Sequence, residues 1–188
     1  MNNELTHWGI KGQKWGVRRY QNKDGSLTAA GRERYSDSIA DTKVYTKKGV
    51  EVTLRKQPTS LITKVAGKLS KSAKDNIERS DFLDITVKGK KVGDLQLYKE
   101  SPKSLNVVWV SIESKHEGNG YGSTVMKAVI DHAKKQNLDK VTLEVPGISP
   151  NARHIYESIG FKAKGTISDE DDSWGGLTAM ELDLRHKK

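Results

Sequence analysis

The feature that most constrains the fold is a run of glycines between a strand-like segment and a helix-like segment. Residues 107–112 are mostly β-branched or aromatic, and residues 124–134 repeat apolar side chains at helical spacing. Between them lies Gly118-Asn119-Gly120-Tyr121-Gly122-Ser123. Glycine adopts backbone conformations that other residues avoid. The run therefore predicts a tight strand-to-helix turn whose main chain can be approached closely by a bound molecule.

Free backbone N–H groups and the positive end of the following helix would favour phosphate oxygens at this turn, so a diphosphate is the natural ligand class. Two nucleotide-binding motifs do not fit. The run lacks the Gly-Lys-Ser/Thr ending of a P-loop, and the spacing of Gly118, Gly120 and Gly122 differs from G-x-G-x-x-G. Taken alone, a glycine-rich turn is more often structural, so both interpretations stay open at this point.

Apolar alternation and turn residues predict a mixed sheet with helices for the rest of the chain. Residues 44–54 flank Lys47-Lys48-Gly49 and predict either a hairpin or a strand preceded by a turn. The strands expected after it are three antiparallel neighbours (82–87, 92–98 and 107–112), a short buried strand (141–145) and two final strands (161–166 and 177–184). Helices are expected over 60–77, 124–134 and 151–159.

Composition bounds the function. A chain of 188 residues accommodates one ordinary domain and an appendage. The absence of cysteine from the sequence excludes disulfides, thiolate zinc sites and a cysteine nucleophile. The five histidines show no metal-ligand spacing, so no metal site is expected. No apolar run approaches the ~20 residues that cross a bilayer, so a soluble protein without membrane partners is expected.

Residues 1–40 differ from the remainder and predict a separate basic module. Trp8-Gly9-Ile10 is echoed by Trp15-Gly16-Val17, and Lys and Arg outnumber Asp and Glu there. Thr28 is placed to cap a brief helix that ends near Tyr35. The formal net charge of the chain is +9, which favours polyanionic partners such as nucleic acid, acidic proteins or a phosphate-rich cofactor. We therefore divide the chain into 1–40 and 41–188.

Three segments in order carry a resemblance to a known family. They are Gly118-Asn119-Gly120-Tyr121-Gly122-Ser123, the strand Leu143-Glu144-Val145, and Asn151-Ala152-Arg153-His154-Ile155-Tyr156-Glu157-Ser158-Ile159-Gly160-Phe161. In order and spacing they resemble the GNAT superfamily of N-acetyltransferases, over residues ~43–185. The resemblance implies an α/β fold with a mixed, mostly antiparallel central sheet flanked by helices. It also implies acetyl-CoA as co-substrate and a primary amine, on a protein or a small molecule, as acceptor.

The resemblance also implies a binding site for acetyl-CoA. The cofactor would occupy a gap between the strand ending near Ile112 and the strand 141–145, with its diphosphate on the glycine turn and its pantetheine arm along the first strand. The implied cofactor-binding residues are Ile112, Ser114, Glu117, Gly118, Asn119, Gly120, Tyr121, Gly122, Ser123 and Asn151. Glu117 departs from the family's Arg or Gln. A carboxylate 4 Å from a solvated phosphate repels it by about 1 kcal/mol, so either its side chain points outward or affinity is reduced.

Amide formation requires a proton acceptor, because lysine and α-amines are largely protonated at neutral pH. Glu144 and Tyr156 resemble the Glu/Tyr pair of bacterial alanine N-terminal acetyltransferases. Glu144 is the expected base, with Glu113 as its rival. The Tyr156 phenol is the expected acid that protonates the departing thiolate. A backbone N–H of the strand ending at Ile112 would stabilise the oxyanion.

The N-terminal segment from His7 to Thr28 resembles a short motif on head-associated and other proteins of phages and prophages of Gram-positive bacteria. It implies a phage-encoded protein in the host cytoplasm, the virion or both, whose residues 1–40 bind a phage head protein or nucleic acid. The alternative to an active enzyme is a catalytically idle GNAT-fold protein of the virion or a nucleic-acid-binding protein. Glu117 is the feature that favours the idle form.

Overall fold

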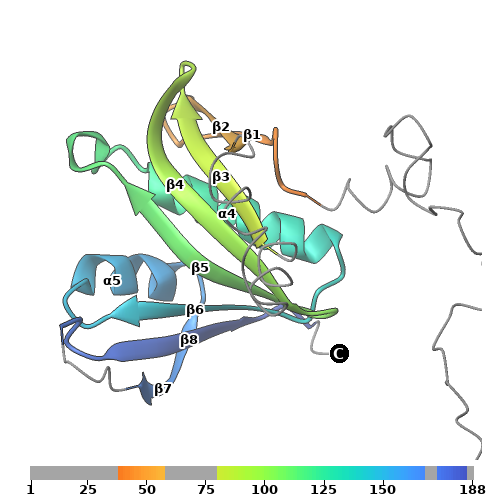
Figure 1. Ribbon diagram of the computed structural model, residues 1–188, viewed down its shortest axis with the longest axis vertical. Helices are drawn as coiled ribbons and strands as arrows, with labels where there is room; N and C mark the ends of the chain where they lie inside the picture. The colour runs from red at the N-terminus through yellow and green to blue at the C-terminus, as the bar shows by residue number, and fades with distance from the viewer. Residues whose placement is uncertain (1–37, 58–79, 168–172, 186–188) are drawn as a thin grey trace, which may run out of the picture. The chain divides into compact units, whose positions relative to one another are not determined.

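The computed structural model describes residues 38–57, 80–167 and 173–185. They form one eight-stranded sheet with the strand order β1-β2-β3-β4-β5-β6-β8-β7 and two α-helices (Figure 1). The chain divides into two compact units, Met1–Ser38 and Ile39–Lys188, and the sheet belongs to the second. The predicted helices 28–35 and 60–77 and the segment from His7 to Thr28 lie outside the described residues.

The first five strands form a continuous antiparallel layer. They are β1 (Lys43–Tyr45), β2 (Glu51–Lys56), β3 (Ser80–Val87), β4 (Lys90–Ser101) and β5 (Ser104–Ile112). The hairpin alternative for residues 44–54 is therefore the observed one, and the three predicted neighbours pair as expected. Leu54, Leu83, Ile85 and Leu95 are buried to 1% exposure or less, because side chains alternate between the two faces of a strand and these share one face.

The chain then crosses the sheet through helix α4 (Tyr121–Lys135) and enters β6 (Lys140–Pro146), which is parallel to β5. Helix α4 begins at Tyr121, three residues before the predicted start, with Gly120 as its cap. Helix α5 (Pro150–Ser158) follows β6, and the last strands are β7 (Lys162–Ile167) and β8 (Leu177–Asp183). β8 pairs between β6 and β7, an order that the sequence does not reveal.

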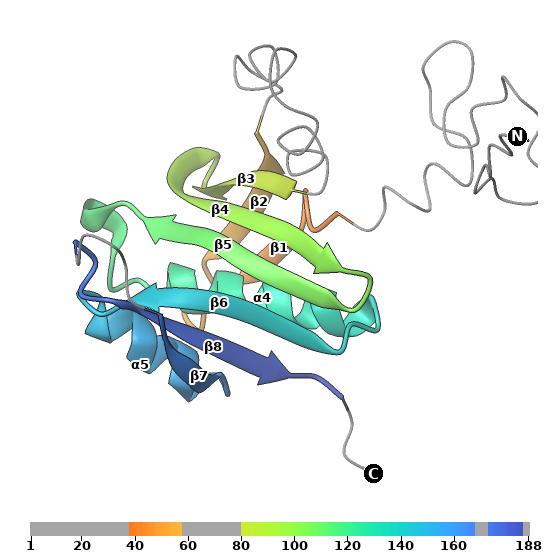
Figure 2. The same ribbon diagram turned by 60° about the horizontal axis from the view of Figure 1, so that its bottom comes forward.

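Both helices cover the same face of the sheet (Figure 2). The buried stripe of α4, which includes Val125, Met126 and Val129, joins the core cluster together with Val141 and Leu143 of β6. Gly160, at the end of α5, lies so close to Leu182 of β8 that an added Cβ would be 3.2 Å from the Leu182 Cδ1 atom. The opposite face of β5 and β6 is the more exposed one, as the alternation along β6 shows.

Candidate active site

The central strands β5 and β6 separate halfway along their length. Their pairing ends at Val107 and Leu143, although β5 continues to Ile112 and β6 continues to Pro146. Beyond that point β5 stays bonded to β4 and β6 stays bonded to β8. Their facing backbone N–H and C=O groups therefore have no strand partner across the gap. Such groups are available to an extended polar molecule laid between the strands.

A β-bulge lies where β5 leaves β6. On β4, Leu97 pairs with Val107 and Gln96 pairs with Trp109, so Val108 is the extra residue and has no partner in the β4 register. Bulges of this kind increase local twist and are common next to active sites. Val108 and Trp109 are 46% and 49% exposed. The bulge therefore lies at the start of the gap, directly after the last β5–β6 pair.

The loop between β5 and α4 is built from glycines in a left-handed conformation and from side-chain bonds to its own backbone. Gly118 has φ 74° and Gly120 has φ 78°, which other residues rarely adopt. The Asn119 amide donates to the carbonyls of His116 (3.0 Å) and Glu117 (3.2 Å), and the Ser123 hydroxyl donates to the Gly120 carbonyl (3.0 Å). These bonds hold the loop in one shape without occupying its N–H groups.

The backbone N–H groups from Gly118 to Ser123 donate to no acceptor in the described part of the chain, whereas the flanking Glu117 and Thr124 donate to Ser114 and Gly120. Three of these N–H groups belong to the first turn of α4, where the positive end of the helix dipole adds to them. Six successive donors without a protein acceptor form a site suited to phosphate oxygens.

Of the other predicted cofactor residues, Ile112, Ser114 and Glu117 precede this loop in the chain, whereas Asn151 lies on α5. Ile112 ends β5, and Ser114 lies in the 3-10 helix η1 (Ser114–His116). Glu117 follows η1 with an exposed side chain, so its carboxylate has room to turn towards solvent. Asn151 is exposed in the first turn of α5.

Tyr156 lies on α5 with its side chain buried. Pro150 begins the helix, and the segment before it is fixed by hydrogen bonds from the Gly147 and Ile148 amides to the carbonyls of Gly176 and Trp174 (2.9 and 3.2 Å). Burial raises the pKa of the Tyr156 phenol above its usual value, and the residue is 9% exposed.

The Tyr156 ring packs at a tilt against the ring of Phe161, with 6.0 Å between centroids. Its hydroxyl has no hydrogen-bond partner among residues 38–57, 80–167 and 173–185. A buried hydroxyl without a partner costs about 1–3 kcal/mol, so this group is suited to a bound molecule.

Glu144 lies on the other face of β6. Leu143 and Val145 are buried on the face that α5 covers, while Glu144 between them is exposed. Asn106 and Thr142 share the Glu144 face, since their side chains bond to each other at 2.9 Å across β5 and β6. The two predicted catalytic residues therefore lie on opposite faces of the sheet.

Glu113, the rival base, is engaged elsewhere. Its carboxylate lies 2.8 Å from the Lys115 ammonium, and the hydrogen bond from Lys115 holds the pKa of Glu113 below its usual range. A carboxylate with a lowered pKa is a weaker proton acceptor. This ion pair makes Glu113 the weaker candidate, and the role of Glu144 as the base stays a prediction.

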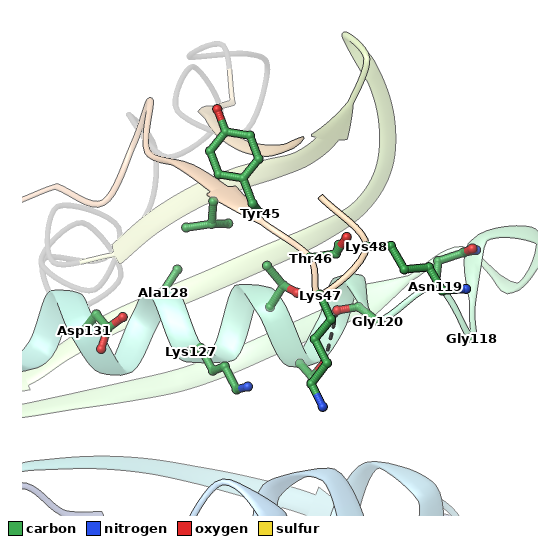
Figure 3. Close-up of a pocket in the computed structure, with 13 residues that line it drawn as sticks. Tyr45, Thr46, Lys47, Lys48, Gly118, Asn119, Gly120, Lys127, Ala128 and Asp131 are labelled. Carbon is green, nitrogen blue, oxygen red and sulfur yellow. Dashed lines mark hydrogen bonds between the residues drawn. The ribbon is translucent and has the colours of Figure 1, made fainter. Parts of the chain in front are cut away.

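A cavity of about 490 Å³ lies between the β1–β2 turn and α4, which lines it as far as Asp131 (Figure 3). It is bordered by the loop residues Gly118, Asn119 and Gly120 and by three lysines that the sequence did not single out as site residues: Lys47, Lys48 and Lys127. We call it the turn–helix cavity. One feature of the sequence could have indicated this cavity. Six residues that line it recur at spacings of three and four, which places them on one face of a helix: Gly120, Ser123, Thr124, Lys127, Ala128 and Asp131.

A family model described as the acetyltransferase (GNAT) family matches residues 60–161. This is more than half of the chain. The chain belongs to the GNAT acetyltransferase family. The resemblance found in the sequence is thereby confirmed, as is the mixed, mostly antiparallel fold. A second model, described as a family of unknown function (DUF7211), matches residues 1–22, so the resemblance of the N-terminal motif to phage proteins stays a prediction.

Curated relatives agree with the GNAT assignment over a limited stretch. Human N-acetyltransferase 8B is 30% identical over 63 residues, which are 34% of this chain and 28% of that protein. The spermidine N(1)-acetyltransferase of Vibrio cholerae is 32% identical over 62 residues, 32% of this chain and 36% of that protein. The chain thus matches about a third of the length of these relatives.

Solved GNAT structures share the fold. A GNAT family acetyltransferase from Elizabethkingia anophelis, crystallised with acetyl-CoA bound, has a TM-score of 0.57 at 14% identity, covering 71% of this chain and 98% of that one. Ard1 from Thermoplasma volcanium has a TM-score of 0.56 at 20% identity, covering 72% and 99%. Acetyl-CoA, the co-substrate expected from the sequence, fits this family and this fold.

In the described ranges, no group of three His, Asp or Glu side chains is arranged to hold a metal ion. Among the same residues, no helix has the length and apolar character needed to cross a bilayer.

Proposed function

We propose that this GNAT protein transfers the acetyl group of acetyl-CoA to a primary amine in the gap between β5 and β6. The observation that carries the proposal is the end of β5–β6 pairing at Val107 and Leu143, followed by two strand ends that face each other unpaired. A gap of this kind offers an extended thioester arm the backbone partners of a missing strand.

The diphosphate of the co-substrate would lie on the free amides of Gly118–Ser123, at the mouth of the gap. Backbone N–H groups donate hydrogen bonds whatever side chain the residue carries. Binding through them therefore does not require a basic side chain at position 117, where this chain has an exposed glutamate. Ile112 and Ser114 would border the pantetheine arm from the β5 side of the gap. Asn151 would border it from α5.

Three groups of the chain would carry the chemistry. Glu144 accepts a proton from the incoming ammonium, directly or through water, which frees the amine lone pair to attack the carbonyl carbon. A backbone N–H of β5 beyond the Val108 bulge stabilises the oxyanion, because a preorganised donor needs no rearrangement during reaction. When the C–S bond breaks, the Tyr156 phenol donates its proton to the thiolate, and the second proton that the nitrogen must lose to become an amide returns to the Tyr156 oxygen, directly or through water.

The opposite positions of Glu144 and Tyr156 support a two-sided site. The thioester would approach from the face that α4 and α5 cover, where Tyr156 is buried, and the amine would approach from the exposed face of β6, where Glu144 lies. The raised pKa of Tyr156 keeps its phenol protonated at neutral pH, as an acid requires.

The acceptor is a primary amine on a protein, at a lysine or an N-terminus, or on a small molecule. The curated relatives include an enzyme named for acetylating spermidine, which supports an amine acceptor in general. An unbiased mass-spectrometric search for added acetyl groups, in cells expressing the protein and in cells expressing Tyr156→Phe, would identify the acceptor. Acetylation that is equal in both would argue against this enzyme as its source.

Calorimetric titration of the full chain with acetyl-CoA tests the proposal directly. We expect saturable binding, together with release of free coenzyme A once an amine acceptor is added. The catalytically idle alternative predicts either no binding heat or binding without release of coenzyme A across a panel of polyamines, aminoglycosides and peptides.

We further propose that residues 1–40 dock the enzyme on a phage head protein or on nucleic acid, in the virion or in the host cytoplasm. The separate family model over residues 1–22 and the surplus of basic residues support a distinct role for this module. For nucleic acid, binding of the full chain to DNA should weaken steeply with salt, and Arg18→Ala with Arg19→Ala should reduce the salt dependence. Unchanged binding in that variant would move the contact elsewhere.

A further inference from the structure

The turn–helix cavity is continuous with the loop that would hold the diphosphate. Its lining follows one stripe of α4 from Gly120 to Asp131 at spacings of three and four residues. The stripe members nearest the loop are small: Ser123 and Thr124, with Ala128 one turn later. Small side chains on the helix leave the space that the β1–β2 turn then roofs. The volume, about 490 Å³, falls in the usual range of ligand pockets, ~300–1,000 Å³.

The roof of the cavity is a rigid turn that presents two lysines. The Gly49 amide donates to the Thr46 carbonyl (2.9 Å), the Thr46 amide donates to the Val50 carbonyl (3.0 Å), and the Val50 amide donates to the Thr46 hydroxyl (3.1 Å). Gly49 has φ 75°, which completes the turn. Lys47 and Lys48 are thereby fixed at its two central positions.

The cavity carries uncompensated positive charge. Lys43, Lys91, Lys103, Lys115, Lys140 and Lys164 each lie within 4 Å of a carboxylate. By contrast, Lys47, Lys48 and Lys127 have no such partner in the described part of the chain. Figure 3 shows Lys47 and Lys127 extending on the same side of α4. The single opposing charge in the lining is Asp131, at the far end of the stripe from the loop.

We propose that the turn–helix cavity binds the 3′-phosphate of the adenosine end of coenzyme A, with Lys47, Lys48 and Lys127 as its charge partners. This inference rests on the proposed function, because it takes the diphosphate to lie on the amides of Gly118–Ser123. It makes these lysines the residues that distinguish coenzyme A from its dephosphorylated form.

The distances along α4 fit this assignment. Lys127 is four residues beyond Ser123, a rise of about 6 Å, and it lies on the same stripe. In coenzyme A, the ribose separates the diphosphate from the 3′-phosphate by a comparable span. A diphosphate at the helix start therefore brings the 3′-phosphate beside Lys127, under the turn that carries Lys47 and Lys48. A phosphate monoester carries close to two negative charges near pH 7, which suits three ammonium groups around one open space.

Binding of coenzyme A and of 3′-dephospho-coenzyme A to the full chain, measured by calorimetry, tests the proposal. We expect the wild type to bind coenzyme A at least tenfold more tightly. We expect the triple variant Lys47→Ala, Lys48→Ala, Lys127→Ala to bind both ligands with equal affinity, close to that of the wild type for the dephosphorylated one. Lys134→Ala, which removes a lysine of α4 outside the cavity lining, is the matched control and should keep the tenfold difference.

Three other outcomes separate the causes. Equal affinities in the wild type would overturn the 3′-phosphate site while leaving the diphosphate site intact. A preserved tenfold difference in the triple variant would overturn the role of these three lysines. Failure of the wild type to bind either ligand would instead overturn the proposed function, and the assignment of the cavity with it.

Discussion

The two halves of the β5–β6 pair are built from the same strands and have opposite properties. In the closed half, residues 104–107 pair with residues 140–143, and Leu105, Val107, Val141 and Leu143 are at most 7% exposed. In the open half, the ends of the strands are bonded only to their outer neighbours, and Val108 and Trp109 are nearly half exposed. One strand pair thus contributes to the core at one end and to a ligand site at the other.

Because of this contrast, we expect substitutions in the closed half of the β5–β6 pair to change the stability of the fold. We expect substitutions around the open half to change catalysis. Removing side chains from the closed half deletes buried apolar contacts, which are the main source of stability. The exposed side chains of the open half, such as Val108 and Trp109, make few such contacts, so their removal should leave the fold intact. Each prediction below tests one side of this division.

The largest expected effect is on stability in the closed half. Leu143→Ala creates a cavity beneath α4 and α5, and should lower the free energy of unfolding by about 2–5 kcal/mol. Chemical denaturation followed by circular dichroism measures it. Val108→Ala, in the open half, is the comparison. It should change the free energy of unfolding by about 0.5 kcal/mol or less, because Val108 is 46% exposed. Similar losses in both variants would contradict the division.

The next largest effect is expected on turnover, from removal of the proposed general acid. Tyr156→Phe should lower turnover about a hundredfold, equivalent to ~2.7 kcal/mol, while acetyl-CoA affinity stays nearly unchanged. Because burial raises the Tyr156 pKa above its usual value, wild-type turnover should not fall through loss of this proton at neutral or mildly alkaline pH. Tyr98→Phe, on β4, is the control and should retain full turnover. Unaltered turnover in Tyr156→Phe would remove the residue from the acid role.

A smaller effect is expected for the base. Glu144→Gln should reduce turnover at neutral pH by roughly tenfold to a hundredfold, since general bases contribute about 10²–10⁴-fold and water can substitute in part. The loss should shrink as pH rises towards the amine pKa, because the acceptor then loses its proton unaided. Glu181→Gln, on the same face but held by Lys140 at 3.0 Å, is the matched control. A pH-independent loss would assign Glu144 a structural role.

Much of this arrangement was predictable because it is encoded locally. Alternation and turn residues predict the antiparallel strands, and the position of Gly160 predicts the end of α5 to within two residues. The loop with Gly118 and Gly120 was recognisable because positive φ angles require a particular residue type.

Features that depend on tertiary contacts could not be predicted in the same way. The Val108 bulge arises from the register between β4 and β5, and the insertion of β8 beside β6 depends on long-range pairing. The turn–helix cavity requires Lys47 and Lys127, 80 positions apart in the sequence, to border one space. Each is a property of packing, which leaves no periodic signal in the chain.

The smallest effect concerns Glu117, where the sequence departs from its family. If the backbone amides of Gly118–Ser123 alone bind the diphosphate, an exposed carboxylate costs about 1 kcal/mol or less through solvent. Glu117→Gln should therefore strengthen acetyl-CoA binding by up to roughly fivefold, with the gain disappearing at high salt. Glu157→Gln, exposed on α5 and paired with Arg153, is the control and should leave affinity unchanged. A loss of affinity in Glu117→Gln would mean that this carboxylate contributes a contact of its own, and that the open half of the site depends on side chains as well as on its backbone.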